Sequence, residues 1–163
     1  MTAITARSTP ALPRAFLVAG LLGCIHAAFS LYWASGGTVL AWSLGADLVA
    51  TFRGREWVLA PIGALKLVVA LAPLFLASKG WPGRRVTRSL CWLGAAVLVL
   101  WGGLNTLVAN LVLVGAIHPS SGFDRAGMIG HAWLWDPLFL AWGTAVVLGL
   151  RARARASGTR RDR

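Results

Sequence analysis

The stretch Trp57–Ala77, WVLAPIGALKLVVALAPLFLA, is an apolar run with one ionisable residue, Lys66, near its centre. A helix of about 20 apolar residues is long enough to cross a hydrocarbon core of roughly 30 Å. In such a helix Lys66 lies roughly 14 Å from either end, farther than its side chain can extend toward water. An isolated charge at that depth costs at least ~2.5–3.5 kcal/mol. We therefore expect Lys66 to face the interior of a helical membrane protein.

The composition of the whole chain also indicates a membrane protein. The 163 residues are 57% hydrophobic and 13% charged, and their mean hydropathy is +0.68, which lies well outside ordinary soluble usage. Besides residues 57–77, three long apolar runs occur at 15–36, 90–115 and 128–150. The sequence predicts an all-α membrane protein with a single domain, residues 14–151, in which four transmembrane helices form an up-down-up-down bundle.

Positive charge is unevenly distributed between the predicted loops. Of the 16 Lys and Arg residues, twelve lie before the first span, between the second and third, or after the fourth, whereas three lie in the other two loops and one is Lys66. The positive-inside rule then places both termini on the cytoplasmic side of the cell membrane. We expect residues 1–13 to be disordered and the basic tail, 152–163, to anchor this topology by contacting anionic membrane lipids. This placement of charge does not favour nucleic acid as a partner.

Neither the cysteines nor the histidines indicate a cofactor. Cys24 and Cys91 fall at different depths in the predicted helices and form no CxxC pair, so a disulfide or a thiol oxidoreductase is not expected. The three histidines fall at different levels, so we expect no metal and no haem.

Each predicted span carries one polar residue at a similar depth. Counting 1.5 Å of rise per residue from the outer end of each span, these residues come out at roughly 12–15 Å: His26, Lys66, Asn105 and Asp136. We hypothesise a Lys66–Asp136 ion pair, flanked by His26 and Asn105. Lys66, Asp136 and His26 are the candidate catalytic residues, because Lys or His can transfer a proton and Asp can act as the carboxylate partner. The alternative is that the pair only fixes helix order.

We expect these polar residues to lie in a pocket that is open toward the outer leaflet. Aromatic faces can hold an apolar or a cationic ligand. The predicted ligand pocket consists of Asn105 and five tryptophans, Trp33, Trp57, Trp101, Trp135 and Trp142.

The start of the fourth span can be interpreted in two ways. Asp136 before Pro137 is a favoured helix start, with Asp at the N-cap. A helix over 137–150 would nevertheless span only about 21 Å, too short for the hydrocarbon core. We therefore expect the helix to begin near Met128, to pass through Asp136 and to bend at Pro137, with the N-cap as the alternative.

The two kinds of connection also carry predictions. The long loop, residues 36–56, is too apolar for a free loop, so we expect a short interfacial helix that serves as a lid or as a membrane-hugging connector. The short inner loop, residues 78–85, predicts that the second and third spans are antiparallel neighbours.

Several short motifs resemble a family of small four-helix integral membrane proteins that is common in actinobacteria and described as a domain of unknown function. These motifs are His26 followed by YWASGG at 32–37, WGG at 101–103, and WDP at 135–137 with Phe139 and Trp142-Gly143. The resemblance covers roughly residues 15–150. It implies a multipass membrane protein and brings no activity with it.

Three functions are compatible with the sequence. The first is a membrane protein that binds a small apolar, lipid-like or isoprenoid-like ligand, with or without catalysis by the polar layer. The second is a non-enzymatic structural or accessory subunit whose polar residues specify packing. The third is a small transporter, which would have to be a homo-oligomer because four helices enclose little room.

Overall fold

The structure is a computed structural model that describes residues 12–158, and all of its regular elements in that range are helical. Residues 1–11 of the predicted disordered segment and 159–163 of the predicted tail lie outside the described residues. The elements in chain order are α1 (Arg14–Ala34), η1 (Ala41–Leu44), α2 (Ala46–Phe52), η2 (Glu56–Val58), α3 (Leu59–Ser78), α4 (Arg84–Leu113), α5 (Arg125–Gly130), η3 (His131–Trp135) and α6 (Asp136–Gly158).

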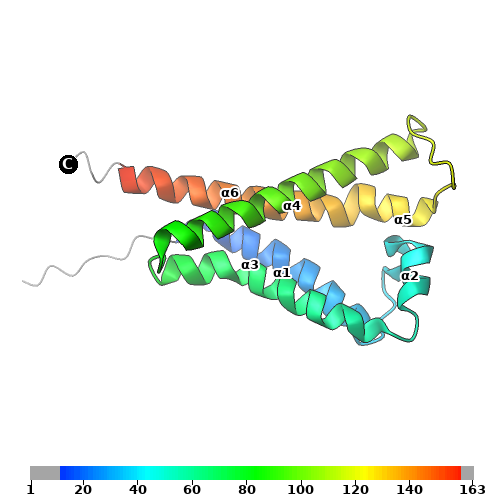
Figure 1. The fold of residues 1–163 in the computed structure, drawn as a ribbon, viewed down its shortest axis with the longest axis horizontal. Helices are drawn as coiled ribbons and strands as arrows, with labels where there is room; N and C mark the ends of the chain where they lie inside the picture. The colour runs from blue at the N-terminus through cyan, green and yellow to red at the C-terminus, as the bar shows by residue number, and fades with distance from the viewer. Residues whose placement is uncertain (1–11, 159–163) are drawn as a thin grey trace, which may run out of the picture.

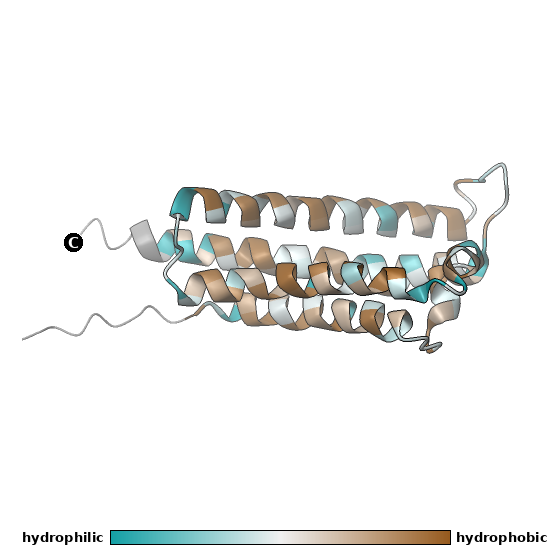
Figure 2. Ribbon diagram, turned by 60° about the horizontal axis from the view of Figure 1, so that its bottom comes forward, coloured by the Kyte–Doolittle hydropathy of each residue, from teal (hydrophilic) through white to brown (hydrophobic). Residues whose placement is uncertain are grey.

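Four helices are long and apolar enough to cross a membrane, which confirms the predicted all-α, four-span architecture. The candidate spans are Arg14–Ala34, Glu56–Ser78, Arg84–Leu113 and Arg125–Arg155. Successive spans alternate in direction, so both described chain ends lie at one end of the bundle, here called the termini end, and α2 lies at the other, the α2 end (Figure 1). Hydrophobic colours dominate the lengths of the four helices in Figure 2.

The helices are arranged in two pairs. The α1 helix packs along α3, α4 packs along α6, and α1 and α6 join the pairs, whereas α3 and α4 hardly touch. In Figure 1 the two pairs lie close together at the termini end and separate toward the α2 end. The second and third spans are antiparallel, as predicted from their short connection at the termini end, but the prediction that they are neighbours is wrong, because they hardly touch.

Small residues explain this pairing, because they let two helix backbones approach closely. A Cβ built on Gly23 of α1 would lie 2.5 Å from the Cβ of Ala70 in α3. A Cβ built on Gly102 of α4 would lie 2.5 Å from the backbone N of Leu140 in α6. Gly63 and Ala70 of α3 thus face α1, and Gly102 of α4 faces α6, which leaves α3 and α4 with little contact between them.

The termini end of the bundle is filled by large side chains. Phe16 and Leu150 are fully buried there, and the Phe16 ring lies 6.0 Å from that of Trp81 between centroids. The buried members of this core are Phe16, Ala19, Ala70, Ala77, Trp81, Ala95, Trp142, Ala145, Val146 and Leu150. None of these side chains is ionisable, so the buried core at this end of the bundle is apolar.

The fourth span is helical from Arg125 onward and passes through Pro137 in its interior. Proline lacks an N–H and clashes with the carbonyl four residues earlier, so it disturbs an α-helix. The turn directly before it, His131–Trp135, is π-helical, and such a wide turn accommodates the disturbance. Asp136 is 2% exposed within this continuous helix, so the alternative that it caps a helix start is wrong. The N-cap is Asp124, whose carboxylate accepts a hydrogen bond from Ala126 N at 2.9 Å.

Candidate ligand-binding cavity

A cavity of about 430 Å³ lies between the two helix pairs at the α2 end. This volume falls within the roughly 300–1,000 Å³ typical of small-molecule sites. All four spans and the α2 segment contribute to its walls, which are mainly apolar and aromatic. The lining residues are His26, Ser30, Trp33, Gly36, Gly37, Thr38, Ala41, Leu44, Leu48, Val49, Phe52, Arg53, Glu56, Leu59, Ile62, Lys66, Trp101, His131, Trp135, Asp136 and Phe139.

Lys66 faces this cavity, and its amine binds neutral groups. Its Nζ donates to Ser30 Oγ at 2.9 Å and lies 3.2 Å from His26 Nδ1 and 5.4 Å from the centre of the Phe139 ring. A protonated Lys66 amine can only donate, so Nδ1 of His26 is the acceptor when Lys66 is protonated. The depth argument thus correctly placed Lys66 and His26 together. The predicted Lys66–Asp136 ion pair is not formed, although both residues line the same cavity.

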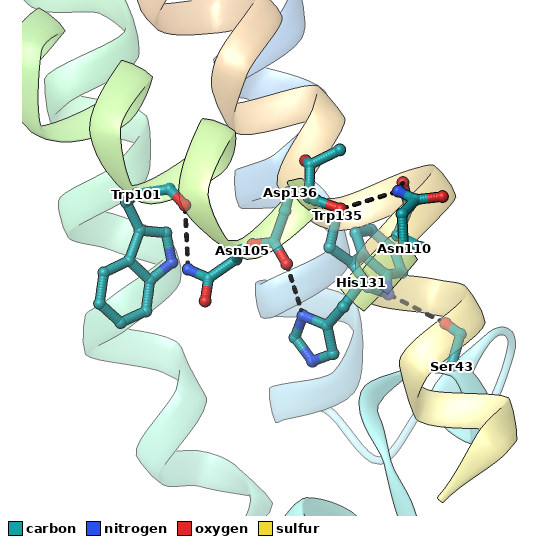
Figure 3. Close-up of polar contacts among 9 residues, drawn as sticks. Ser43, Trp101, Asn105, Asn110, His131, Trp135 and Asp136 are labelled. Atoms are coloured by element: carbon teal, nitrogen blue, oxygen red, sulfur yellow. Dashed lines mark hydrogen bonds and ion pairs between the residues drawn. The ribbon is translucent and has the colours of Figure 1, made fainter. Parts of the chain in front are cut away.

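Asp136 is paired with His131 instead. The two side chains lie 2.8 Å apart between Oδ2 and Nδ1, with the carboxylate 3% and the imidazole 42% exposed (Figure 3). Residues five apart lie on different faces of a regular α-helix, but the π-helical turn between them brings these two side chains together. The buried Asp136 carboxylate thus has a hydrogen-bond partner within its own span, and the Lys66 amine contacts Ser30 and His26 instead.

The six predicted pocket residues divide into two groups. Three line the cavity, namely Trp33, Trp101 and Trp135. The other three are not among the lining residues. Trp57 is 68% exposed before α3, and Trp142 is 1% exposed within the core of the termini end. Asn105 donates from Nδ2 to the Trp101 carbonyl on its own helix at 2.9 Å (Figure 3).

Aromatic rings form the innermost wall of the cavity. The His26 imidazole lies 3.9 Å from the Phe139 ring and 5.7 Å from the Trp135 ring between centroids. Phe29 and Trp33 lie 5.1 Å and 4.9 Å from Trp135 in edge-to-face geometry. Edge-to-face contacts add stability beyond the burial of area. The rings therefore hold His26 in place beside the Lys66 amine.

The η1 and α2 segment covers the cavity and is fixed to α5 and η3. Trp135 donates from Nε1 to the buried Ser43 Oγ at 3.0 Å (Figure 3), and Ala46 N donates to Asp124 Oδ2 at 2.7 Å. Gly130 permits this close approach, because a Cβ there would overlap the Ser43 carbonyl. Leu48, Val49 and Phe52 also line the cavity. The long loop thus packs over the cavity.

Residues 23–146 match the family model described as "Protein of unknown function (DUF3995)". The chain belongs to this family. No curated protein and no solved structure matches it. Every residue that lines the cavity of this DUF3995 protein lies within the matched stretch, so the cavity is built from the family's shared region.

The sequence predictions did not include two residues that are central to the DUF3995 cavity. Phe139 lies under the Lys66 amine and against His26, yet in the sequence it was named only within a family motif and was given no role in the pocket. His131 was assigned no role, because its spacing of five from Asp136 does not suggest a contact in a regular helix. The position of Ser30 could be predicted from the sequence, because its spacing of four residues from His26 places both side chains on one face of α1.

Two expected features concern metals and thiols. Within residues 12–158, no group of three His, Cys, Asp or Glu residues is placed to hold a metal ion. Cys24 and Cys91 are both free thiols. The lining residues that carry polar side-chain groups are His26, Ser30, Trp33, Thr38, Arg53, Glu56, Lys66, Trp101, His131, Trp135 and Asp136.

Proposed function

We propose that this DUF3995 protein binds a small apolar molecule, lipid-like or isoprenoid-like, in the cavity at the α2 end. The observation that carries this proposal is the cavity of about 430 Å³ with mainly apolar walls and a few convergent polar groups. Small-molecule sites have this composition, in which apolar walls supply affinity and polar groups supply orientation. Lys66, His26 and Asp136 are the groups of this site that could transfer a proton to or from the bound molecule.

The filled termini end of the bundle favours binding over transport. A conducting path needs a route through both halves of the bundle, whereas the described core at the termini end consists of close-packed apolar side chains. A monomer with this core closes one end of the cavity. The transporter alternative would require a path between the subunits of a homo-oligomer, outside this cavity.

The charge distribution supports the orientation of the cavity. Arg84, Arg85, Arg88, Arg151, Arg153 and Arg155 lie at the termini end, and by the positive-inside rule that end is cytoplasmic. The cavity then faces the outer leaflet of the cell membrane. Reporter fusions after residue 158 and within the α4–α5 loop test this topology, and an external C-terminus would contradict it.

The proposed function is tested by searching for a ligand that purifies with the protein. The full chain is extracted in mild detergent and its bound lipids are identified by mass spectrometry. Ala41→Phe fills the cavity and should abolish the co-purified molecule, because Ala41 lines it. Ala64→Phe is the matched control, since Ala64 is exposed on α3 and does not line the cavity. Equal lipid content in both variants would contradict the proposal and favour the accessory-subunit alternative.

A further inference from the structure

Lys66 is an incompletely partnered cation in the cavity wall. An ammonium group has three N–H donors. In the part of the chain from residue 12 to residue 158, two of them have acceptors, Ser30 Oγ and His26 Nδ1, and the third has none. Among residues 12–158 no ion pair joins this amine to a carboxylate, and the lining carboxyl group of Asp136 contacts His131 instead. The third donor of the Lys66 amine is thus available to an acceptor on a bound molecule.

The surroundings of Lys66 make this charge a strong determinant of what can bind. Its neighbours toward the cavity are the Phe139 ring, the His26 ring and apolar side chains such as Ile62. In an environment with little water, the interaction between opposite charges is much stronger than at a solvated surface. An anionic group placed beside Nζ would supply the missing acceptor and neutralise the cation in a single contact.

The walls also indicate where the rest of such a ligand would lie. The cover formed by η1 and α2 is bound to α5 and η3 through Ser43 and Asp124, so the α2 end is closed by fixed contacts. On the side between α3 and α4 the helices hardly touch, and two lining residues, Ile62 and Trp101, are 41% and 61% exposed. In a bilayer this side faces the acyl chains, so an apolar tail can extend from the cavity directly into the hydrocarbon.

We propose that the cavity binds a single-chain lipid with an anionic head group, a carboxylate or a phosphate, whose head contacts the Lys66 amine and whose tail leaves between α3 and α4. This proposal rests on the proposed function and specifies its ligand class. Ser30 Oγ and His26 Nδ1 hold the amine toward the head group, and Trp101 flanks the tail at the opening between the helices. A neutral or cationic amphiphile of the same length would bring no anionic acceptor to the Lys66 amine.

The test compares chains of equal length that differ in the charge of the head group. Binding of tritiated palmitate and hexadecanol to the detergent-purified full chain is measured by scintillation proximity. The wild type should bind palmitate roughly 10- to 100-fold more tightly than hexadecanol, because a hydrogen bond to a charged group is stronger than one to a neutral group. Lys66→Met should remove that preference. Lys79→Met is the matched control, since Lys79 is the other lysine of the chain, is exposed and also lies over a phenylalanine ring.

A competition experiment on the wild type gives an answer that does not depend on folding of the Lys66 variant. Hexadecyl phosphate should displace bound palmitate, and hexadecyltrimethylammonium should not. If palmitate binds but hexadecyl phosphate does not displace it, the head group is a carboxylate rather than a phosphate, and the proposal holds for carboxylates alone. Equal binding of palmitate and hexadecanol, with no effect of Lys66→Met, overturns the head-group proposal and leaves the apolar cavity function intact. If the wild type binds neither palmitate nor hexadecanol, both the head-group proposal and the proposed cavity function are wrong.

Discussion

Replacing Gly102 by alanine should destabilise the protein, because the backbones of α4 and α6 are in contact there. The added Cβ would lie 2.5 Å from Leu140 N and 2.6 Å from the Asp136 carbonyl oxygen, whereas ordinary contact begins at 3.4 Å. Both obstructing atoms belong to the backbone, so the two helices must separate locally by the difference between 3.4 and 2.5 Å, about 0.9 Å. Overpacking of this kind costs about 1–3 kcal/mol. The ratio of folded to unfolded protein should fall roughly 5- to 150-fold.

Unfolding in mixed micelles with increasing SDS, followed by tryptophan fluorescence, measures this loss. Gly94→Ala on the same helix is the matched control, because a Cβ at Gly94 meets nothing within 4 Å. The control should change the free energy of unfolding by no more than about 0.5 kcal/mol. If Gly102→Ala and Gly94→Ala are equally stable, then α4 and α6 are not in close contact at Gly102, and the account of helix pairing by small residues is refuted.

Three further predictions concern the polar contacts around the cavity. Ser43→Ala leaves a buried indole N–H without its acceptor, so the free energy of unfolding should fall by about 1–3 kcal/mol in the same assay. The backbone N–H of Ala46 donates to Asp124 and holds the pKa of that carboxyl below its ordinary value. The stability that this contact adds is therefore present above roughly pH 4 and is lost as the pH falls through the folded-state pKa. Asp124→Asn should remove this acid-dependent loss in thermal melts between pH 6 and pH 3, and an unchanged pH profile would contradict it. His131→Phe leaves a carboxylate that is 3% exposed without its partner, whereas Asp136→Leu leaves an imidazole that is 42% exposed without its partner. The first variant should therefore have the lower free energy of unfolding, and the double variant should recover part of that loss of stability.

The spans and the depth of their polar residues could be predicted from the sequence. Hydropathy and length define a span. Because residues 137–150 alone are too short to cross the hydrocarbon core, the same argument predicted that the fourth helix begins earlier and includes Asp136 and Pro137. Depth also brought Lys66 and His26 to the same level. These predictions succeed because the thickness of a bilayer constrains position along a helix axis.

Rotation about the helix axis and the choice of neighbouring helices could not be predicted in the same way. Asn105 has a suitable depth, but its amide donates to a carbonyl of its own helix, and Trp142 lies in the core of the termini end. The short loop between α3 and α4 suggested packed neighbours, whereas the small residues of each helix face a different partner. The contact between His131 and Asp136 depends on a π-helical turn, for which no reliable sequence signal was available.

The π-helical turn His131–Trp135 contains one residue more than the α-helical turn it replaces. The wide turn absorbs this extra residue, so deleting one residue from it would leave a regular α-helical turn with the helix on either side nearly in register. Gly130 would still face Ser43 and Gly127 would still face Gly45, which now pack directly on them. A codon lost from this turn would therefore leave the cover of the cavity in place, whereas the same loss from a regular turn between the cover contacts and the bundle core would rotate the preceding residues by about 100°.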